Sequence, residues 1–233
     1  SELQEKYGSP NPKGLMEYIS TCKREFKPQT KFQYSCLNYI TLQHIIETIT
    51  GQSLRDFAKE NIFDILGMQY TDYLPTIQQQ DGKWINTVAC PWMDRIAPTE
   101  KQKDGSVLCG QVHDPLARIL NGGISGNAGI FSNANDIGIL AAALLNGGEY
   151  NGHRILSPLG VKTMCTVPRE LTAFGRTPGG IFSLPMPQTR VIFSVRIPLA
   201  IQDIQELPSS SIRTTTRPSF CWLTLFIRKT GIA

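Results

Sequence analysis

The sequence lacks any long apolar run. None of its apolar runs reaches the roughly 18 residues that a membrane-spanning helix needs. The start of the chain, SELQEKYGSP, has neither an initiator methionine nor the basic and then apolar pattern of a signal peptide. We therefore predict no transmembrane segment, and the cellular compartment stays open.

Metal-binding patterns are missing too. The six cysteines are far apart without a C-x-x-C pair, and no two of the three histidines have the spacing of metal ligands. The sequence thus predicts no metal site. Disulfide frameworks are typical of much shorter chains. We expect the cysteines to be mostly free and buried, as small apolar side chains are.

Excess charge of one sign is confined to the C-terminal part of the chain. Residues 178–233 hold six of the 23 Lys and Arg and two of the 19 Asp and Glu, which leaves 17 of each sign in residues 1–177. Residues 1–177 therefore give no charge-based sign of a nucleic-acid partner. With 41% hydrophobic and 18% charged residues, the composition is that of a globular protein.

Helical periodicity is clearest in the first third of the chain. Apolar residues at helical spacing predict helices over 13–24 and 37–50, and the wide apolar stripe of the second indicates a helix packed well into a core. Gly51 is expected to end that helix. Ser53 fits the N-cap of the next one, with Asp56 as its capping-box partner, and Gly67 fits its end.

Shorter elements are predicted further along. Trp84 to Val88 and Gly126 to Ser132 read as short strands. Asp114, followed by proline, fits the cap of a short helix. Asn133 or Asn135 fits the cap of a helix that starts at about residue 136. Ser157, also followed by proline, fits the cap of a further helix.

Two long stretches carry a family resemblance. They are FQYSCLNYITLQHIIETITGQSLRDFAKENIFDILGMQYTDYLP and VHDPLARILNGGISGNAGIFSNANDIGILAAALLNGG, the latter followed by RILSP. In this order they resemble the serine β-lactamase and penicillin-binding-protein superfamily, within its class C β-lactamase-related branch, over about residues 28–168. The resemblance implies an α/β (α+β) fold of the β-lactamase/transpeptidase type. Residues 1–177 would supply mostly its helical lobe and connecting segments, with an incomplete central sheet.

The same resemblance implies acyl transfer through a serine. The expected substrates are a β-lactam, a D-alanyl peptide of peptidoglycan type or an ester, and no cofactor is implied. Relatives use a Ser-x-x-Lys at a helix start for the nucleophile and its base, a Tyr-x-Asn turn for proton transfer, and a [K/H]-[T/S]-G strand beside the oxyanion hole.

The second of these elements is present in part. Tyr34-Ser35-Cys36 stands where the family has Tyr-x-Asn, so the resemblance makes Tyr34 the general base or acid. Cys36 departs from the pattern, because a thiol lacks the donor and acceptor of an amide. Asn38, two residues on, is a partial replacement. Without the resemblance, Tyr34 would read as an aromatic residue at a helix start.

The first element has one weak candidate. The chain's single Ser-x-x-Lys runs from Ser20 to Lys23, about one such match is expected by chance, and it lies 14 residues before Tyr34. The family spacing is many tens of residues, so Ser20 and Lys23 are a weak nucleophile pair. A triad of Ser125 with His113 and Asp114 is a second alternative, disfavoured because neighbours in sequence seldom face each other.

The third element is absent as written, but a shifted reading frame can encode it. When each codon's third base is joined to the next codon's first two, Ala200–Pro208 can encode H-T-G-Y-T-G-T-S, preceded by Gly. This string matches the family's third motif, and three flanking segments agree in order. The hypothesis is that residues 178–233 are an out-of-frame tail; the alternative is a genuine basic extension.

Two functional interpretations follow. The first is a fragment of a β-lactamase-related serine hydrolase that is inactive as given. The alternative, from another class, is a non-catalytic binding or interaction module that kept the helical lobe. A retained module predicts a C-terminus consistent with its fold, which residues 178–233 do not offer.

Overall fold

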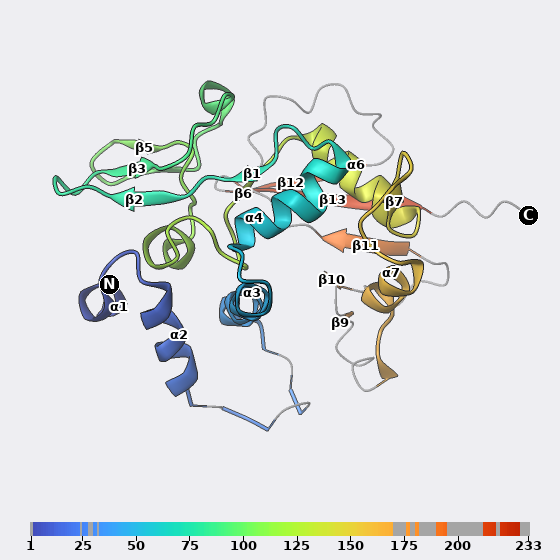
Figure 1. Ribbon diagram of the computed structural model, residues 1–233, viewed down its shortest axis with the longest axis horizontal. Helices are drawn as coiled ribbons and strands as arrows, with labels where there is room; N and C mark the ends of the chain where they lie inside the picture. The colour runs from blue at the N-terminus through green and yellow to red at the C-terminus, as the bar shows by residue number, and fades with distance from the viewer. Residues whose placement is uncertain are drawn as a thin grey trace, which may run out of the picture. The chain divides into compact units, whose positions relative to one another are not determined.

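A computed structural model describes residues 2–23, 25–27, 30–31 and 33–169, and, beyond these, the backbone of several short strands (Figure 1). The chain forms two compact units. The first comprises residues 1–27 and 33–133, and the second comprises residues 28–32 and 134–233. Each unit is described by itself.

Helices dominate the first half of the first unit. They are α1 (Glu2–Tyr7), α2 (Pro12–Thr21), α3 (Cys36–Thr50), α4 (Leu54–Ala58), a π-helical segment η1 (Lys59–Phe63) and α5 (Asp64–Leu66). The helices predicted over 13–24 and 37–50 are therefore confirmed within two or three residues. The predicted helix after Ser53 is three consecutive segments, with one π-helical turn between two α-helical ones.

The expected helix boundaries between α3 and α5 are confirmed. Gly51 follows α3 in the left-handed conformation with φ 71°, which glycine adopts without a Cβ penalty. The hydroxyl of Ser53 accepts a hydrogen bond from the Asp56 N–H at 3.1 Å and donates to the Asp56 carboxylate at 2.7 Å. Gly67 ends α5 in the same left-handed way as Gly51.

One buried cluster of the first unit lies between α2, α3 and a later π-helical segment, η3 (Leu116–Leu120). Leu15, Ile40 and Leu120 are buried together there. The opposite side of α3 is open, because Leu42 and Ile49 are 52% and 79% exposed. The expectation that α3 packs well into a core thus holds for one face only. The buried face of this helix contacts α2, η3 and the loop that follows η3.

The strands of the first unit form two-stranded antiparallel pairs. β1 (Asp72–Tyr73) pairs with β6 (Ile130–Phe131), β2 (Thr76–Gln78) with β3 (Trp84–Asn86), and β4 (Glu100–Lys101) with β5 (Val107–Leu108). A 3₁₀ segment, η2 (Met93–Arg95), lies between β3 and β4. The strand predicted over 126–132 shortens to β6, because residues before it form a turn closed by the Ser125–Ala128 bridge.

The second unit begins with α6 (Ala134–Leu145), the hairpin β7 (Glu149–Tyr150) and β8 (His153–Arg154), and α7 (Pro158–Cys165). Asn135 lies inside α6, so of the two predicted caps only Asn133 precedes the helix. Ser157 caps α7 as predicted, since its hydroxyl accepts from the Gly160 N–H at 3.0 Å. Burial raises the pKa of Cys165 at the end of α7.

Short strands follow α7. β9 (Arg176–Thr177) pairs with β10 (Gly180–Ile181), and β13 (Phe220–Arg228) lies between β11 (Arg190–Ser194) and β12 (Ile212–Arg217) in an antiparallel sheet. Threonine, isoleucine and aromatic residues favour strands, so these segments have strand propensity whether or not the tail is read in frame. The molecule is thus a mixed α/β protein with small, incomplete antiparallel sheets, as expected.

The cysteine prediction is half right. The five cysteines of the described part of the chain are free, but none is buried: Cys22 and Cys109 are exposed, and Cys36, Cys90 and Cys165 are half-buried. They lie at helix ends and in loops, where few other segments pack against their side chains. No helix in residues 2–169 is long and apolar enough to span a membrane.

Candidate active site

The Tyr34 turn forms the entry to α3. Ser35 is its N-cap, with extended backbone (φ −149°, ψ 129°) and a hydroxyl that accepts from the Leu37 N–H at 3.2 Å. This cap turns the chain so that the Tyr34 hydroxyl lies 3.5 Å from the Cys36 sulfur. The Tyr34 side chain is 57% exposed. The structure therefore brings Tyr34 and Cys36 together at an open helix start.

Asn38 lies elsewhere on the same helix. It is the third residue of α3, and Cys36 is the first. At 3.6 residues per turn, positions two apart diverge by about 200° around the helix axis. The Asn38 side chain is exposed on that other side, so it does not join Tyr34 and Cys36.

Ser20 and Lys23 are at the wrong end of a helix for a nucleophile pair. Ser20 is in the last turn of α2, where its hydroxyl donates to the Glu17 carbonyl at 2.7 Å. Lys23 follows the end of that helix, and both residues are exposed. The family arrangement needs a serine at a helix start and a lysine one helical turn on, and α2 does not provide this.

The alternative triad is not assembled either. The Ser125 hydroxyl is buried, accepts from the Asn121 amide at 2.7 Å and donates to Asn127 at 2.6 Å. The His113 Nδ1 lies 3.4 Å from a Glu100 carboxylate oxygen. Asp114 caps its helix as predicted, accepting from the Ala117 N–H at 2.9 Å. Ser125 therefore belongs to a structural network.

That network centres on Gln43, which the sequence analysis missed. Gln43 is 7% exposed, and its amide makes four hydrogen bonds. Its oxygen accepts from Asn121 Nδ2 at 3.3 Å and from the Gly126 N–H at 3.0 Å, and its nitrogen donates to Glu47 and to the Ile124 carbonyl, each at 3.1 Å. The sequence signal that could have revealed this buried residue was a glutamine within the apolar stripe of α3.

The loop over 121–129 approaches α3 at backbone distance. A Cβ at Gly126 would lie 2.1 Å from the Tyr39 carbonyl oxygen, closer than any side chain can come. The close approach of the loop to α3 therefore requires glycine at position 126, and the hydrogen bonds of Gln43 hold the loop in place. Beneath it, burial raises the pKa of the Tyr73 hydroxyl well above its ordinary value, and the Glu47 carboxylate adds to the increase.

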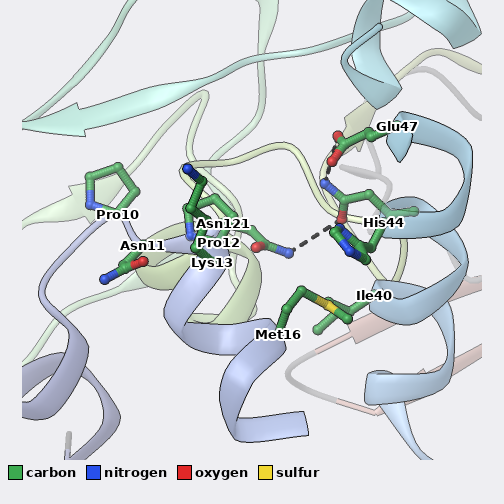
Figure 2. Close-up of a pocket in the computed structure, with 10 residues that line it drawn as sticks. Pro10, Asn11, Pro12, Lys13, Met16, Ile40, His44, Glu47 and Asn121 are labelled. Carbon is green, nitrogen blue, oxygen red and sulfur yellow. Dashed lines mark hydrogen bonds between the residues drawn. The ribbon is translucent and has the colours of Figure 1, made fainter. Parts of the chain in front are cut away.

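A pocket of about 440 Å³ opens on the side of α3 that carries Gln43, and it faces the start of α2 (Figure 2). Its walls come from residues 10–16 of the α2 region, from α3 and from Asn121: Pro10, Asn11, Pro12, Lys13, Met16, Ile40, Gln43, His44, Glu47 and Asn121. The described residues hold no group of three or more His, Cys, Asp or Glu side chains placed to bind a metal ion.

Comparison with known proteins identifies the family of this chain. The sequence model of the family described as Beta-lactamase matches residues 2–185. A protein of Escherichia coli (strain K12), named as an inferred D-alanyl-D-alanine carboxypeptidase, is 34% identical over 172 residues, covering 69% of this chain and 37% of its own. A protein of the same name from Salmonella agona is 30% identical over 182 residues, covering 73% and 40%.

Among solved structures, a D-stereospecific amidohydrolase from Streptomyces sp. covers 72% of this chain and 43% of its own, with a TM-score of 0.46 and 17% identity. The chain belongs to the Beta-lactamase family, a serine hydrolase family with the β-lactamase/transpeptidase-like fold. It spans 37% of the length of the E. coli relative.

Proposed function

We propose that residues 1–177 are part of a β-lactamase-related serine hydrolase domain and that the chain as given performs no acyl transfer. The observation that carries the proposal is the Tyr34 turn. Tyr34 occupies the proton-transfer position of the family motif, and its hydroxyl lies beside the Cys36 thiol, 3.5 Å away, where relatives have an amide. A proton-transfer group without a neighbouring nucleophile has no reaction to assist.

Neither candidate serine supplies that nucleophile. The Ser20 hydroxyl is bonded within α2 and has no lysine one turn ahead of it on a helix. Ser125 is 1% exposed and held between two asparagines. An activated serine needs a base within hydrogen-bond reach and access to substrate. Ser20 lacks the first and Ser125 lacks both.

The test is covalent labelling of the full chain with a fluorophosphonate and with a fluorescent penicillin, read by intact mass. We expect no adduct on the folded protein, as checked by circular dichroism. Ser20→Ala and Ser106→Ala, the latter at another exposed serine, are the matched variants. An adduct lost only in Ser20→Ala would make Ser20 the nucleophile, and one kept in both variants would place the nucleophile elsewhere. Either result overturns the proposal.

We also propose that residues 178–233 are translated out of frame. Ala200–Pro208, whose codons can encode the family's third motif in the shifted frame, lies outside the described residues. The support is the order of four shifted-frame matches. Sequencing the locus and the loci of close relatives tests this. A missing base near the codons for Arg176–Pro178 is expected, and an uninterrupted frame through the present tail in relatives would refute it.

The out-of-frame proposal bears on activity. The family's third motif forms a strand that lines the reaction pocket beside the oxyanion hole. Without it, a nucleophile supplied from elsewhere would still lack one pocket wall. Restoring the frame is therefore a second experiment, and we expect it to return the strand motif while leaving the need for a Ser-x-x-Lys unmet.

A further inference from the structure

The sequence contains three Asn-Gly pairs, at positions 121–122, 146–147 and 151–152. Such a pair is prone to spontaneous deamidation, because glycine has no side chain to shield its backbone nitrogen. In this reaction the glycine nitrogen gives its proton to solvent and attacks the side-chain carbonyl carbon of the asparagine. The bond from that carbon to the amide nitrogen breaks, and ammonia leaves with a proton from water. A second water then opens the cyclic imide to aspartate or isoaspartate.

The fold restrains two of the three pairs. Asn121 is 7% exposed, and its amide nitrogen donates to two neighbouring side chains. Asn146 is exposed just after α6, but its amide nitrogen donates to the Glu149 carbonyl at 3.1 Å. The N–H of Gly147, which would have to attack, donates to the Leu144 carbonyl at 3.2 Å. Ring closure at either pair must therefore first break hydrogen bonds.

The third pair lacks such restraints. Asn151 and Gly152 are the two turn residues between β7 and β8, and both are exposed. Their φ angles are 48° and 80°, positive as the type I′ turn of a two-residue hairpin loop requires. Within the described residues, no hydrogen bond holds the Asn151 side chain or the Gly152 N–H. Two residue pairs alone join the strands, so the turn can open and bring the reacting groups together at little cost.

We propose that Asn151 is a spontaneous modification site, which the folded chain converts to aspartate or isoaspartate while Asn121 and Asn146 stay intact. The two products differ in their effect on the hairpin. Aspartate tolerates the left-handed conformation as asparagine does, so it keeps the two-residue loop. Isoaspartate adds a methylene group to the backbone, which lengthens the loop and disturbs the strand register. The site is independent of the Tyr34 turn and of any acyl transfer.

The residues after the turn make the contacts that isoaspartate would disturb. The Arg154 guanidinium donates to the Gly147 and Leu156 carbonyls at 2.8 and 2.9 Å. The Ile155 N–H donates to the Gly148 carbonyl at 2.9 Å. These hydrogen bonds tie the segment after α6 to the segment before α7. A change in the register of the hairpin would therefore loosen the connection between the two helices.

The experiment is incubation of the full chain in mildly alkaline buffer, with peptide mapping by mass spectrometry at intervals and a parallel sample unfolded in urea. We expect Asn151 to deamidate at least about tenfold faster than Asn146 and Asn121 in the folded chain, because local opening costs least at an exposed turn. In urea the three rates should be similar. Similar rates in the folded chain, or no reaction at Asn151 while the urea sample reacts, would overturn the proposal.

The variant Asn151→Asp supplies the aspartate product directly and removes the reactive amide. We expect it to abolish the fast deamidation and to leave amide hydrogen exchange at Ile155 as it is in the unmodified chain. The isoaspartate form, separated from aged protein by chromatography, should exchange Ile155 at least about tenfold faster, since the hairpin that protects this amide has opened. A fast reaction that persists in Asn151→Asp would refute the site, and equal exchange in all three forms would refute the effect of isoaspartate on the hairpin.

Discussion

Replacing Gln43 by methionine should destabilise the first unit by about 3 kcal/mol. Methionine keeps nearly the volume of glutamine, so the loss comes from hydrogen bonds and not from a cavity. Four hydrogen bonds disappear, and a buried group left without a partner costs about 1–3 kcal/mol. Gly126 and Ile124 are half-buried, so water can replace some of these contacts, which keeps the total below the sum.

The assay is urea unfolding followed by far-UV circular dichroism, with amide hydrogen exchange at Gly126. That amide donates to Gln43 in the folded protein, so its protection should fall selectively in Gln43→Met. Gln80→Ala, at an exposed loop position, is the control and should change stability by less than about 0.5 kcal/mol. A Gln43→Met loss as small as that of the control would refute the network as a stabilising feature.

Three further changes have defined outcomes. Arg55→Met leaves Asp72, bonded by two guanidinium nitrogens at 2.9 and 2.7 Å and only 18% exposed, without its cation, and should lower unfolding free energy by about 2 kcal/mol in urea melts. Gly126→Ala forces a methyl group onto the Tyr39 carbonyl and should cost about 3 kcal/mol in the same melts. Burial raises the pKa of Cys90, so less of its thiolate is present at pH 8 in the folded chain than in the urea-unfolded chain. Iodoacetamide should therefore alkylate Cys90 more slowly in the folded chain, with the difference closing as pH rises.

Local chemistry made part of the fold predictable. Ser53, Asp114 and Ser157 each precede a helix and cap it, because a short oxygen-bearing side chain satisfies N–H groups that the helix cannot. Gly51 ends α3 because it alone tolerates the left-handed turn at no cost. These signals act over three or four residues, so one sequence is enough to read them.

Contacts between residues far apart in the sequence could not be predicted, because these local signals act over only three or four residues. Gln43 and Gly126 are 83 residues apart in the hydrogen bond that joins them, and no local pattern pairs them. Periodicity marked α3 as apolar on a wide face, but it could not say which neighbours cover that face. Leu42 and Ile49 remain exposed, while α2, η3 and the loop over 121–129 contact other positions of α3.

The Tyr34 turn illustrates why a family motif is weak evidence for activity. Ser35 begins α3 by capping it, and α3 in turn supplies Ile40 to the core and Gln43 to the network. The turn is therefore required for the fold whether or not Tyr34 transfers a proton. Helix capping constrains position 35 and leaves position 36 open, since the first residue of a helix needs no particular side chain to complete it. A cysteine at position 36 is compatible with a stable α3, although its thiol lacks the donor and acceptor of the amide in the family motif, so helix capping and the family motif make separable demands on adjacent residues.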